Sequence, residues 1–195
     1  MPPTRPILTI GHSRHSWELF TALLAVAGVE AIADIRSAPR SRFSPQFNKD
    51  AMREALAARG VGYIFLGKEL GGRPRSQDLY TDGVADYEKM VASPEFRHGL
   101  DRLMETARRS NLAAMCSEAD PLECHRCLLV GRALAAQGAD VRHILASGKI
   151  VAHAEVEERL LSLENLAEDL LANSREARLA EAYRARSRKA GYRTP

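Results

Sequence analysis

Short apolar runs alternate with helix-like patterns along the first 150 residues of the chain. Each run is rich in aliphatic side chains and is followed within two residues by Gly, Ser or a charged residue, which is typical of a buried strand. We expect strands at residues 7–10, 29–35, 63–66, 112–116 and 141–145. Between the runs, apolar residues recur every three or four positions, and this spacing predicts amphipathic helices.

Several of these helical patterns follow a residue that caps helices. Ser16 precedes the first one, and Ser93 precedes Pro94, a residue suited to the first helical position. We expect Asp120 to begin another helix that runs to residue 137 and carries Cys124 in its first turn.

The order βαβαβαβαβ predicts an α/β fold: a single three-layer domain with a mainly parallel sheet of about five strands, flanked by helices. We place this domain at residues 1–150 and a helical C-terminal extension at 151–195. Residues 151–172 hold six acidic and one basic side chain, whereas 174–195 hold seven basic and two acidic ones. We interpret the basic half as an exposed, partly frayed helix.

Composition narrows the class of protein. The chain has 195 residues, is 45% hydrophobic and carries a net charge of +3, which is typical of an ordinary globular domain. It has no apolar stretch of about 18 residues and no signal-peptide pattern, so we expect a cytoplasmic protein that does not enter a membrane. The three cysteines are clustered and odd in number, which argues against a disulfide framework.

The segment 116–126 concentrates reactive side chains: Cys116, Glu118, Cys124, His125 and Arg126. It follows an expected strand and precedes an expected helix, the place where α/β proteins bind ligands. A position in the first helical turn, beside a histidine and an arginine, favours the thiolate of a cysteine, although nearby acidic residues oppose it. Cys116 and Cys124 are therefore candidate nucleophiles, and His125 is a candidate ligand-binding residue.

The cysteines also allow two other interpretations. Cys124 and Cys127 form a C-x-x-C pair, which is typical of thiol–disulfide exchange, but we prefer Cys127 as a core residue. Cys116, Cys124 and a histidine could hold zinc, yet the spacing of the two cysteines is not a standard zinc motif. We therefore assign no metal ligand from the sequence.

Other polar residues follow the remaining strands, and the carboxyl ends of parallel strands share one edge of a sheet. We therefore expect the side chains of Asp34 and Glu118 to face one cleft as an acid–base pair, although Asp34 serves equally well as a structural partner of Arg36 or Arg126. His12 is a further candidate base. Ser13, Gly71 and Gly72 are candidate ligand-binding positions at the same edge.

Arginines are dense in the loops near this edge. We expect Arg36, Arg42 and Arg126 to bind an anion, because guanidinium groups match phosphate oxygens. Further arginines lie on the same loops, at positions 40, 73 and 75. Neither a Walker pattern nor G-x-G-x-x-G occurs, so a classical nucleotide cofactor is not indicated.

These motifs resemble those of a known family, the domain of unknown function 488. The resemblance covers residues 7–150 in the family's order and rests on residues 9–13, Asp34-Ile35-Arg36, Pro39, Ser41, Arg42, Phe43, Tyr63, 66–67, 70–72, Cys116-x-Glu118-x-x-Pro121-x-x-Cys124-His125-Arg126 and His143-Ile144. Cys127 lies outside the pattern, and Ser147 stands where the family has an aspartate. The resemblance implies the fold and the location of a site, and it implies no particular reaction.

Three functions are consistent with these observations. The first is an enzyme that hydrolyses or transfers a group on a phosphate-bearing ligand, such as a nucleotide or nucleic acid, with Glu118 or Asp34 as acid–base and Cys124 or Cys116 as nucleophile. The second is a cysteine-based metal-binding or thiol redox protein. The third is a non-catalytic nucleic-acid-binding module that uses the arginine-rich loops and the basic C-terminus.

Overall fold

The computed structural model describes residues 3, 5–167 and 174–194. Within them, six strands form one sheet in the order β3-β2-β6-β1-β7-β8. Five are parallel and confirm the expected sheet: β1 (Ile7–Gly11), β2 (Ala31–Asp34), β3 (Gly62–Phe65), β6 (Leu112–Cys116) and β7 (Val141–Ile144). The sixth, β8 (Ile150–Ala152), pairs antiparallel with β7 at the edge.

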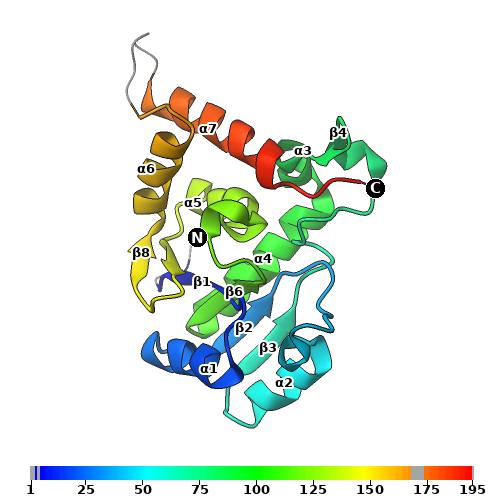
Figure 1. The fold of residues 1–195 in the computed structure, drawn as a ribbon, viewed down its shortest axis with the longest axis vertical. Helices are drawn as coiled ribbons and strands as arrows, with labels where there is room; N and C mark the ends of the chain where they lie inside the picture. The colour runs from blue at the N-terminus through cyan, green and yellow to red at the C-terminus, as the bar shows by residue number, and fades with distance from the viewer. Residues whose placement is uncertain (1–2, 4, 168–173, 195) are drawn as a thin grey trace.

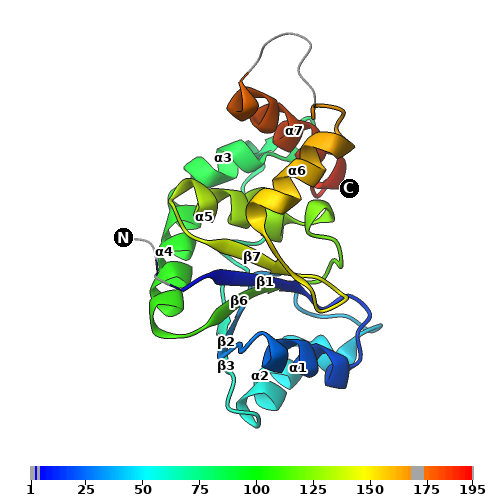
Figure 2. The same ribbon diagram turned by 90° about the vertical axis from the view of Figure 1, so that its left-hand side faces the viewer.

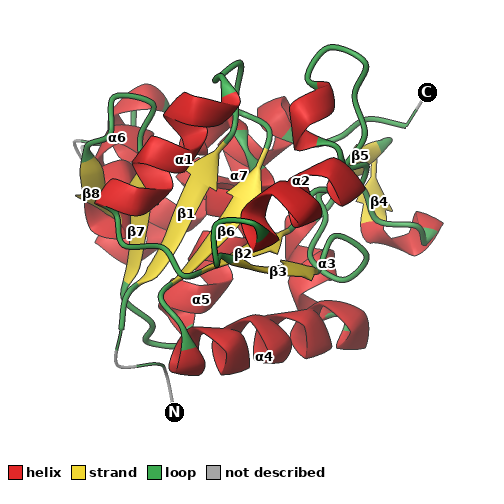
Figure 3. Cartoon of the chain, turned by 90° about the horizontal axis from the view of Figure 1, so that it is seen from below, coloured by secondary structure: helices red, strands yellow, loops and turns green. Residues whose placement is uncertain are grey.

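Helices cover both faces of the sheet, as Figure 3 shows. One face packs against α1 (Trp17–Val26) and α2 (Lys49–Ala57). The other packs against a larger set: α3 (Tyr87–Ala92), α4 (Pro94–Arg109), the π-type turn η4 (Arg126–Gly131) with α5 (Arg132–Ala136), α6 (His153–Leu163) and α7 (Arg175–Ala190). The three layers of an α/β domain are therefore present.

Strand alternation decides which residues reach each helical layer. Ile32 on β2 and Met115 on β6 belong to the core beneath α1 and α2. Ala33 and Cys116, one position further along, belong to the core beneath α4 and α5. Asp34, next to Ala33, therefore points toward the α1–α2 layer. The alternation of side chains along the strands therefore places the candidate site residues in two separate groups.

The C-terminal helices are packed parts of the molecule. Leu160 on α6 and Tyr183 on α7 are buried in the same core as the sheet, so the expectation of an exposed, frayed basic helix is wrong. Figures 1 and 2 show α7 crossing from α6 toward α3. Residues 168–173, between α6 and α7, lie outside the described part. No helix among the described residues is long and apolar enough to cross a membrane.

Two further strands form a small hairpin that the apolar pattern does not reveal. β4 (Tyr80–Thr81) and β5 (Val84–Ala85) have two residues each, too short for an alternation to be recognised. Ser16 and Ser93 cap α1 and α4 as expected, because each side-chain oxygen accepts the backbone N–H three residues later. Short 3-10 turns at Pro45–Phe47, Gln77–Leu79 and Pro121–Glu123 complete the fold.

Candidate functional site

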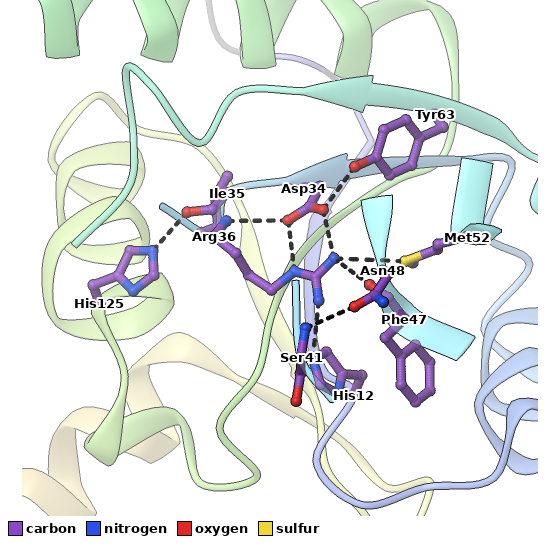
Figure 4. Close-up of polar contacts among 10 residues, drawn as sticks. All are labelled: His12, Asp34, Ile35, Arg36, Ser41, Phe47, Asn48, Met52, Tyr63 and His125. Carbon is purple, nitrogen blue, oxygen red and sulfur yellow. Dashed lines mark hydrogen bonds and ion pairs between the residues drawn. The ribbon is translucent and has the colours of Figure 1, made fainter. Parts of the chain in front are cut away.

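The candidate residues divide into two groups on opposite faces of the sheet. Asp34, Arg36 and His12 lie on the side of α1 and α2, as shown in Figure 4. Cys116 and Glu118 lie with Cys124 and His125 on the side of α5. The expectation that Asp34 and Glu118 face one cleft is therefore wrong. Side chains alternate between the two faces of a sheet, and Asp34 points to one face whereas Glu118 contacts Cys116 on the other.

Asp34 and Arg36 form a buried, two-pronged ion pair. The Nε of Arg36 donates to Oδ1 of Asp34 at 2.9 Å, and Nη2 donates to Oδ2 at 2.7 Å. The hydroxyl of Tyr63 donates to the same Oδ2 at 2.7 Å, and Nη2 of Arg36 also donates to the carbonyl of Phe47 at 2.8 Å. Asp34 is 0% exposed and Arg36 is 6% exposed. Their polar atoms are thus committed to the protein interior.

His12 belongs to the same group. Its Nε2 lies 3.2 Å from Nη1 of Arg36, and its Nδ1 lies 2.9 Å from the carbonyl oxygen of Ser13. A guanidinium only donates, so Nε2 is the acceptor and Nδ1 carries the proton. Burial, together with Arg36, lowers the pKa of His12 to about 4. The imidazole is neutral, has both nitrogens occupied and stacks on Phe47.

Ser13 and the loop that contains Gly71 and Gly72 shape the surroundings of the two groups through their backbone conformation. Ser13 has φ of 47°, a left-handed conformation that is uncommon for serine, at the end of β1. A Cβ on Gly72 would lie 2.9 Å from Cγ of His125, and one on Gly71 would lie 2.3 Å from the oxygen of Gly67. The loop therefore packs closely over the imidazole because it lacks side chains there.

The second group forms a compact cluster of four potential ligands. Oε2 of Glu118 lies 3.0 Å from Sγ of Cys116 and 2.9 Å from Sγ of Cys124. Nδ1 of His125 lies 3.6 Å from Sγ of Cys116 and 3.9 Å from Sγ of Cys124. The two cysteines and His125 are buried, whereas Glu118 is exposed and only turns its carboxyl inward. Three of the four potential ligand residues are thus shielded from solvent.

A backbone carbonyl fixes the orientation of His125. Its Nε2 lies 2.9 Å from the carbonyl oxygen of Ile35, so Nε2 carries a proton (Figure 4). In the neutral ring, the lone pair of Nδ1 then faces the two sulfur atoms. Sequence reasoning does not reveal this contact, because it joins residues 90 positions apart through a main-chain atom.

Cys124 lies before its helix rather than inside the first turn. The side chain of Asp120 accepts the N–H of Leu122 and caps only the 3-10 turn Pro121–Glu123. Cys124 is extended, its carbonyl accepts the N–H groups of Cys127 and Leu128 at 3.1 Å, and its Sγ accepts the N–H of Arg126 at 3.4 Å. Cys124 is therefore the N-cap residue of the helix that carries Arg126, where a helix favours negative charge.

The protonation equilibria of the cluster are shifted in opposite directions. Burial opposes ionisation of Cys124, but its hydrogen bond with Cys116, the charge of Arg126 and the contact with His125 together place its pKa well below the usual value. Burial, followed by the contact with Cys124, raises the pKa of Cys116. Burial and the charge of Cys124 also raise the pKa of Glu118. Burial lowers the pKa of His125, but its contacts with Cys124 and Glu118 raise it overall. The four groups therefore favour one thiolate, at Cys124.

Arg126 holds the turn that carries Glu118. Its guanidinium is fully buried, and it donates to the carbonyl oxygens of Glu118 at 2.5 Å and Ala119 at 2.7 Å. Gly11 lies against the same turn, where a Cβ would be only 1.8 Å from the carbonyl oxygen of Glu118. The Nε of Arg126 has no partner among the described residues. Arg126 thus binds the protein's own main chain.

The remaining sequence candidates lie apart from the cluster. Arg42 is exposed and stacks on the exposed ring of Phe43, with 4.7 Å between the guanidinium carbon and the ring centroid. Cys127 is fully buried among apolar residues, and burial raises the pKa of its thiol. This environment is that of a core residue.

Sequence reasoning missed a buried polar chain. His153, the first residue of α6, is 6% exposed. Nε2 of His143 and Nδ1 of His153 are 2.9 Å apart, and Nε2 of His153 lies 2.9 Å from the hydroxyl of Tyr183. The hydroxyl of Thr9 lies 2.8 Å from Nδ1 of His143, and that of Tyr183 donates to Glu157 at 3.1 Å. This series of hydrogen-bonded side chains has no local sequence signal, because its members come from β1, β7, α6 and α7.

A comparison with protein families identifies the family of this chain. The family described as Domain of unknown function DUF488 matches residues 16–133, more than half of the chain, and this range includes the four residues of the cluster. No curated protein matches the chain, and no solved structure does. The chain therefore belongs to the DUF488 family.

Proposed function

We propose that this protein binds one divalent metal ion of the zinc type through Cys116, Cys124 and His125, with Glu118 at the fourth position. The observation that carries the proposal is the clustering itself: one ligand atom from each of the four residues lies within 4.8 Å of the others. Thiolate, imidazole and carboxylate are the ligands that zinc prefers.

The distances support a tetrahedral site. With zinc–sulfur bonds of about 2.3 Å and zinc–nitrogen bonds of about 2.0 Å, sulfur and nitrogen ligands lie about 3.5 Å apart. The Sγ atoms of Cys116 and Cys124 lie 3.6 and 3.9 Å from Nδ1 of His125. The oxygen of Glu118 is closer to the sulfurs, at 3.0 and 2.9 Å, so the carboxyl has to move outward by roughly half an ångström. Its exposed position leaves space for this movement.

The surroundings of the cluster also suit a metal ion. Metal-binding histidines commonly donate their second ring N–H to a carbonyl or carboxylate, as His125 does to Ile35. Two thiolates and a carboxylate around a doubly charged ion leave one negative charge. Arg126, a buried guanidinium bound only to carbonyl oxygens, supplies one positive charge nearby.

Glu118 gives this site a chemical role. It is the exposed member of the four, so water or a substrate can displace it while the three buried ligands stay in place. Three protein ligands and one exchangeable position are typical of catalytic zinc, which lowers the pKa of bound water. We therefore propose that an ion held by Cys116, Cys124 and His125 would activate water for a hydrolysis, and that Glu118 would be the acid–base group. Arg36 and Arg126 lend no support to a phosphate-bearing substrate at this position, because Arg36 is bound to Asp34 on the other face of the sheet and both Nη atoms of Arg126 bind main-chain carbonyl oxygens.

Thiol chemistry at Cys124 is the second candidate. The N-cap position and the contact with His125 favour its thiolate, and Sγ of Cys116 is close enough for a disulfide after a small rearrangement. Against it, Cys124 is 1% exposed and Cys116 is 3% exposed, which leaves little room for an incoming substrate.

Metal titration of the reduced protein tests the proposal. We expect one equivalent of Co²⁺ to give the intense sulfur-to-metal absorption of thiolate ligands, and Zn²⁺ to displace it. Cys116→Ser, Cys124→Ser and His125→Ala should each weaken binding by at least about tenfold, whereas Cys127→Ser, at a buried cysteine outside the cluster, should bind normally. Reduced protein that binds neither ion would contradict the proposal. Reversible loss of two thiols on oxidation, without metal binding, would favour the thiol candidate.

A further inference from the structure

A cavity lies beside the C-terminal helix, away from the cysteine cluster. It has a volume of about 280 Å³ and lies between the β4–β5 hairpin, the start of α3 and the C-terminal half of α7. Residues 192–194 pair with the hairpin, since Ala85 donates to the carbonyl of Tyr192 and Thr194 donates to that of Gly83, both at 2.9 Å. Figure 1 shows this C-terminal segment running past α3 toward β4. The cavity is thus formed by segments from distant parts of the chain.

One hydroxyl in this cavity has no partner. Ser187 on α7 lines the cavity and is 9% exposed, and its Oγ makes no hydrogen bond to any described residue. A buried hydroxyl without a partner is costly, so native proteins usually satisfy it with protein, water or ligand. The Ser187 hydroxyl is therefore an unsatisfied donor and acceptor buried in the wall of the cavity.

Four arginines and three acidic residues line the cavity together with Ser187. Arg188 and Arg193 line the cavity, and neither has a carboxylate within ion-pair distance in the described part of the chain. Nη2 of Arg193 donates only to the carbonyl of Arg188, at 3.2 Å. Of the three acidic lining residues, Glu88 pairs with Arg184 at 2.9 Å, and Asp86 accepts the N–H groups of Glu88 and Lys89 at the start of α3. The third, Asp82, has no ion pair with a described residue. The two unpaired guanidinium groups thus outnumber the one unpaired carboxylate.

We infer that this cavity binds a small phosphate monoester. Guanidinium forks match phosphate oxygens, and the Ser187 hydroxyl can donate to the same group. Val84, Ala85 and Tyr87 form an apolar wall that can contact the organic part of the ester. This inference is independent of the metal site, because none of the four cluster residues lines the cavity.

Calorimetric titration with phenyl phosphate tests the inference, with benzoate and inorganic phosphate as comparison ligands. We expect phenyl phosphate to bind more tightly than either. The double variant Arg188→Gln/Arg193→Gln should weaken binding by at least about tenfold, and Ser187→Ala should weaken it by several fold. Arg97→Gln, an exposed arginine on α4, and Ser162→Ala, an exposed serine on α6, are the matched controls and should bind normally.

Three outcomes would overturn the inference: no binding of phenyl phosphate to the folded wild-type protein, equal affinity for benzoate, or unchanged affinity in the double variant. Circular dichroism of each variant separates a lost ligand contact from a failure to fold. Zn²⁺ or Co²⁺ binding at the cysteine cluster should be the same in all these variants, so failure of one proposal can be distinguished from failure of the other.

Discussion

At the scale of single residues, the two groups of polar side chains have different physical roles. The carboxylate of Asp34 is neutralised by Arg36 and receives a further hydrogen bond from Tyr63, which makes this group a buried link between β2, β3 and the segment before α2. In the Cys116–Glu118–Cys124–His125 cluster, by contrast, four potential ligand atoms lie within 4.8 Å of one another, and the proposed metal site rests on this arrangement.

The Asp34–Arg36 pair is expected to be structural. Arg36→Gln leaves a buried carboxylate without its partner, so the free energy of unfolding should fall by roughly 3–5 kcal/mol. Arg53→Gln, which removes an exposed arginine that pairs with Asp50 on α2, should cost less than about 1 kcal/mol. Urea denaturation of both variants measures the difference. Equal stabilities would show that the buried pair contributes nothing to the fold.

Gly72 is expected to set the position of the His125 ring. A methyl group at Gly72 would lie 2.9–3.0 Å from ring atoms of His125, including Nδ1, and would displace the nitrogen that faces the sulfurs. Gly72→Ala should therefore weaken metal binding by about 10- to 100-fold, as is usual for changes behind a ligand. Gly62→Ala is the control, because its new Cβ makes its nearest contact at 3.4 Å. Equal Co²⁺ affinities in competition titrations would contradict this role.

At the scale of elements, the apolar periodicity predicts the five parallel strands to within a few residues, because each strand is an uninterrupted buried run between polar turns. The helix after β6 is different. Asp120 and Pro121 have the chemistry of a helix start, but they produce only a 3-10 turn, and the extended backbone of Cys124 separates it from the helix proper. Local residue preferences do not reveal that break, because it is stabilised by Arg126 reaching back to the turn.

The buried, hydrogen-bonded pair of His143 on β7 and His153 on α6 predicts that the stability of the protein depends on pH. Burial lowers the pKa of His153 to about 4 and that of His143 well below its usual value, while in the unfolded chain both are near 6.5. Between pH 6.5 and 4 the unfolded state therefore binds more protons, and the free energy of unfolding falls as pH falls. Each such histidine contributes about 1.4 kcal/mol per pH unit in this range.

Urea denaturation at several pH values from 7.5 to 5 measures this slope. His153→Gln should reduce the slope by about 1.4 kcal/mol per pH unit, which corresponds to the uptake of one proton. His98→Gln, at an exposed position on α4, should leave the slope unchanged. An unchanged slope in His153→Gln would show that the buried histidine does not drive the dependence.

At the scale of the whole molecule, α6 and α7 belong to the same core as the sheet and also hold the turn that carries Glu118 and Cys124. Arg186 on α7 donates to the carbonyl of Leu122 at 2.9 Å and pairs with Glu123, and Arg159 on α6 pairs with Asp120. The sequence indicates a cluster within residues 116–125, because its four members lie close together along the chain. It does not indicate the distant contacts from Ile35, Gly72 and α7, since these depend on how the layers pack.

Arg186→Gln tests how much the contact of α7 with Leu122 and Glu123 stabilises the fold. The arginine side chain is 12% exposed, so its loss leaves the carbonyl of Leu122 poorly satisfied, and the free energy of unfolding should fall by about 1–3 kcal/mol. Arg175→Gln, at an arginine on α7 whose side chain is 42% exposed and which pairs with Glu158, should change it by less than about 1 kcal/mol. Thermal unfolding compares the two. Equal losses of unfolding free energy in the two variants would show that the contact of Arg186 with the turn does not stabilise the fold more than an exposed ion pair does.

The central claim is that Cys116, Cys124 and His125 hold one metal ion beside Glu118. X-ray absorption spectroscopy of the zinc-loaded protein tests it most directly, because it counts sulfur and lighter ligands around the ion. The account predicts a four-coordinate ion with two sulfur ligands at about 2.3 Å and two nitrogen or oxygen ligands at about 2.0–2.1 Å. An ion without sulfur ligands, or one with four sulfurs contributed by two chains, would contradict it.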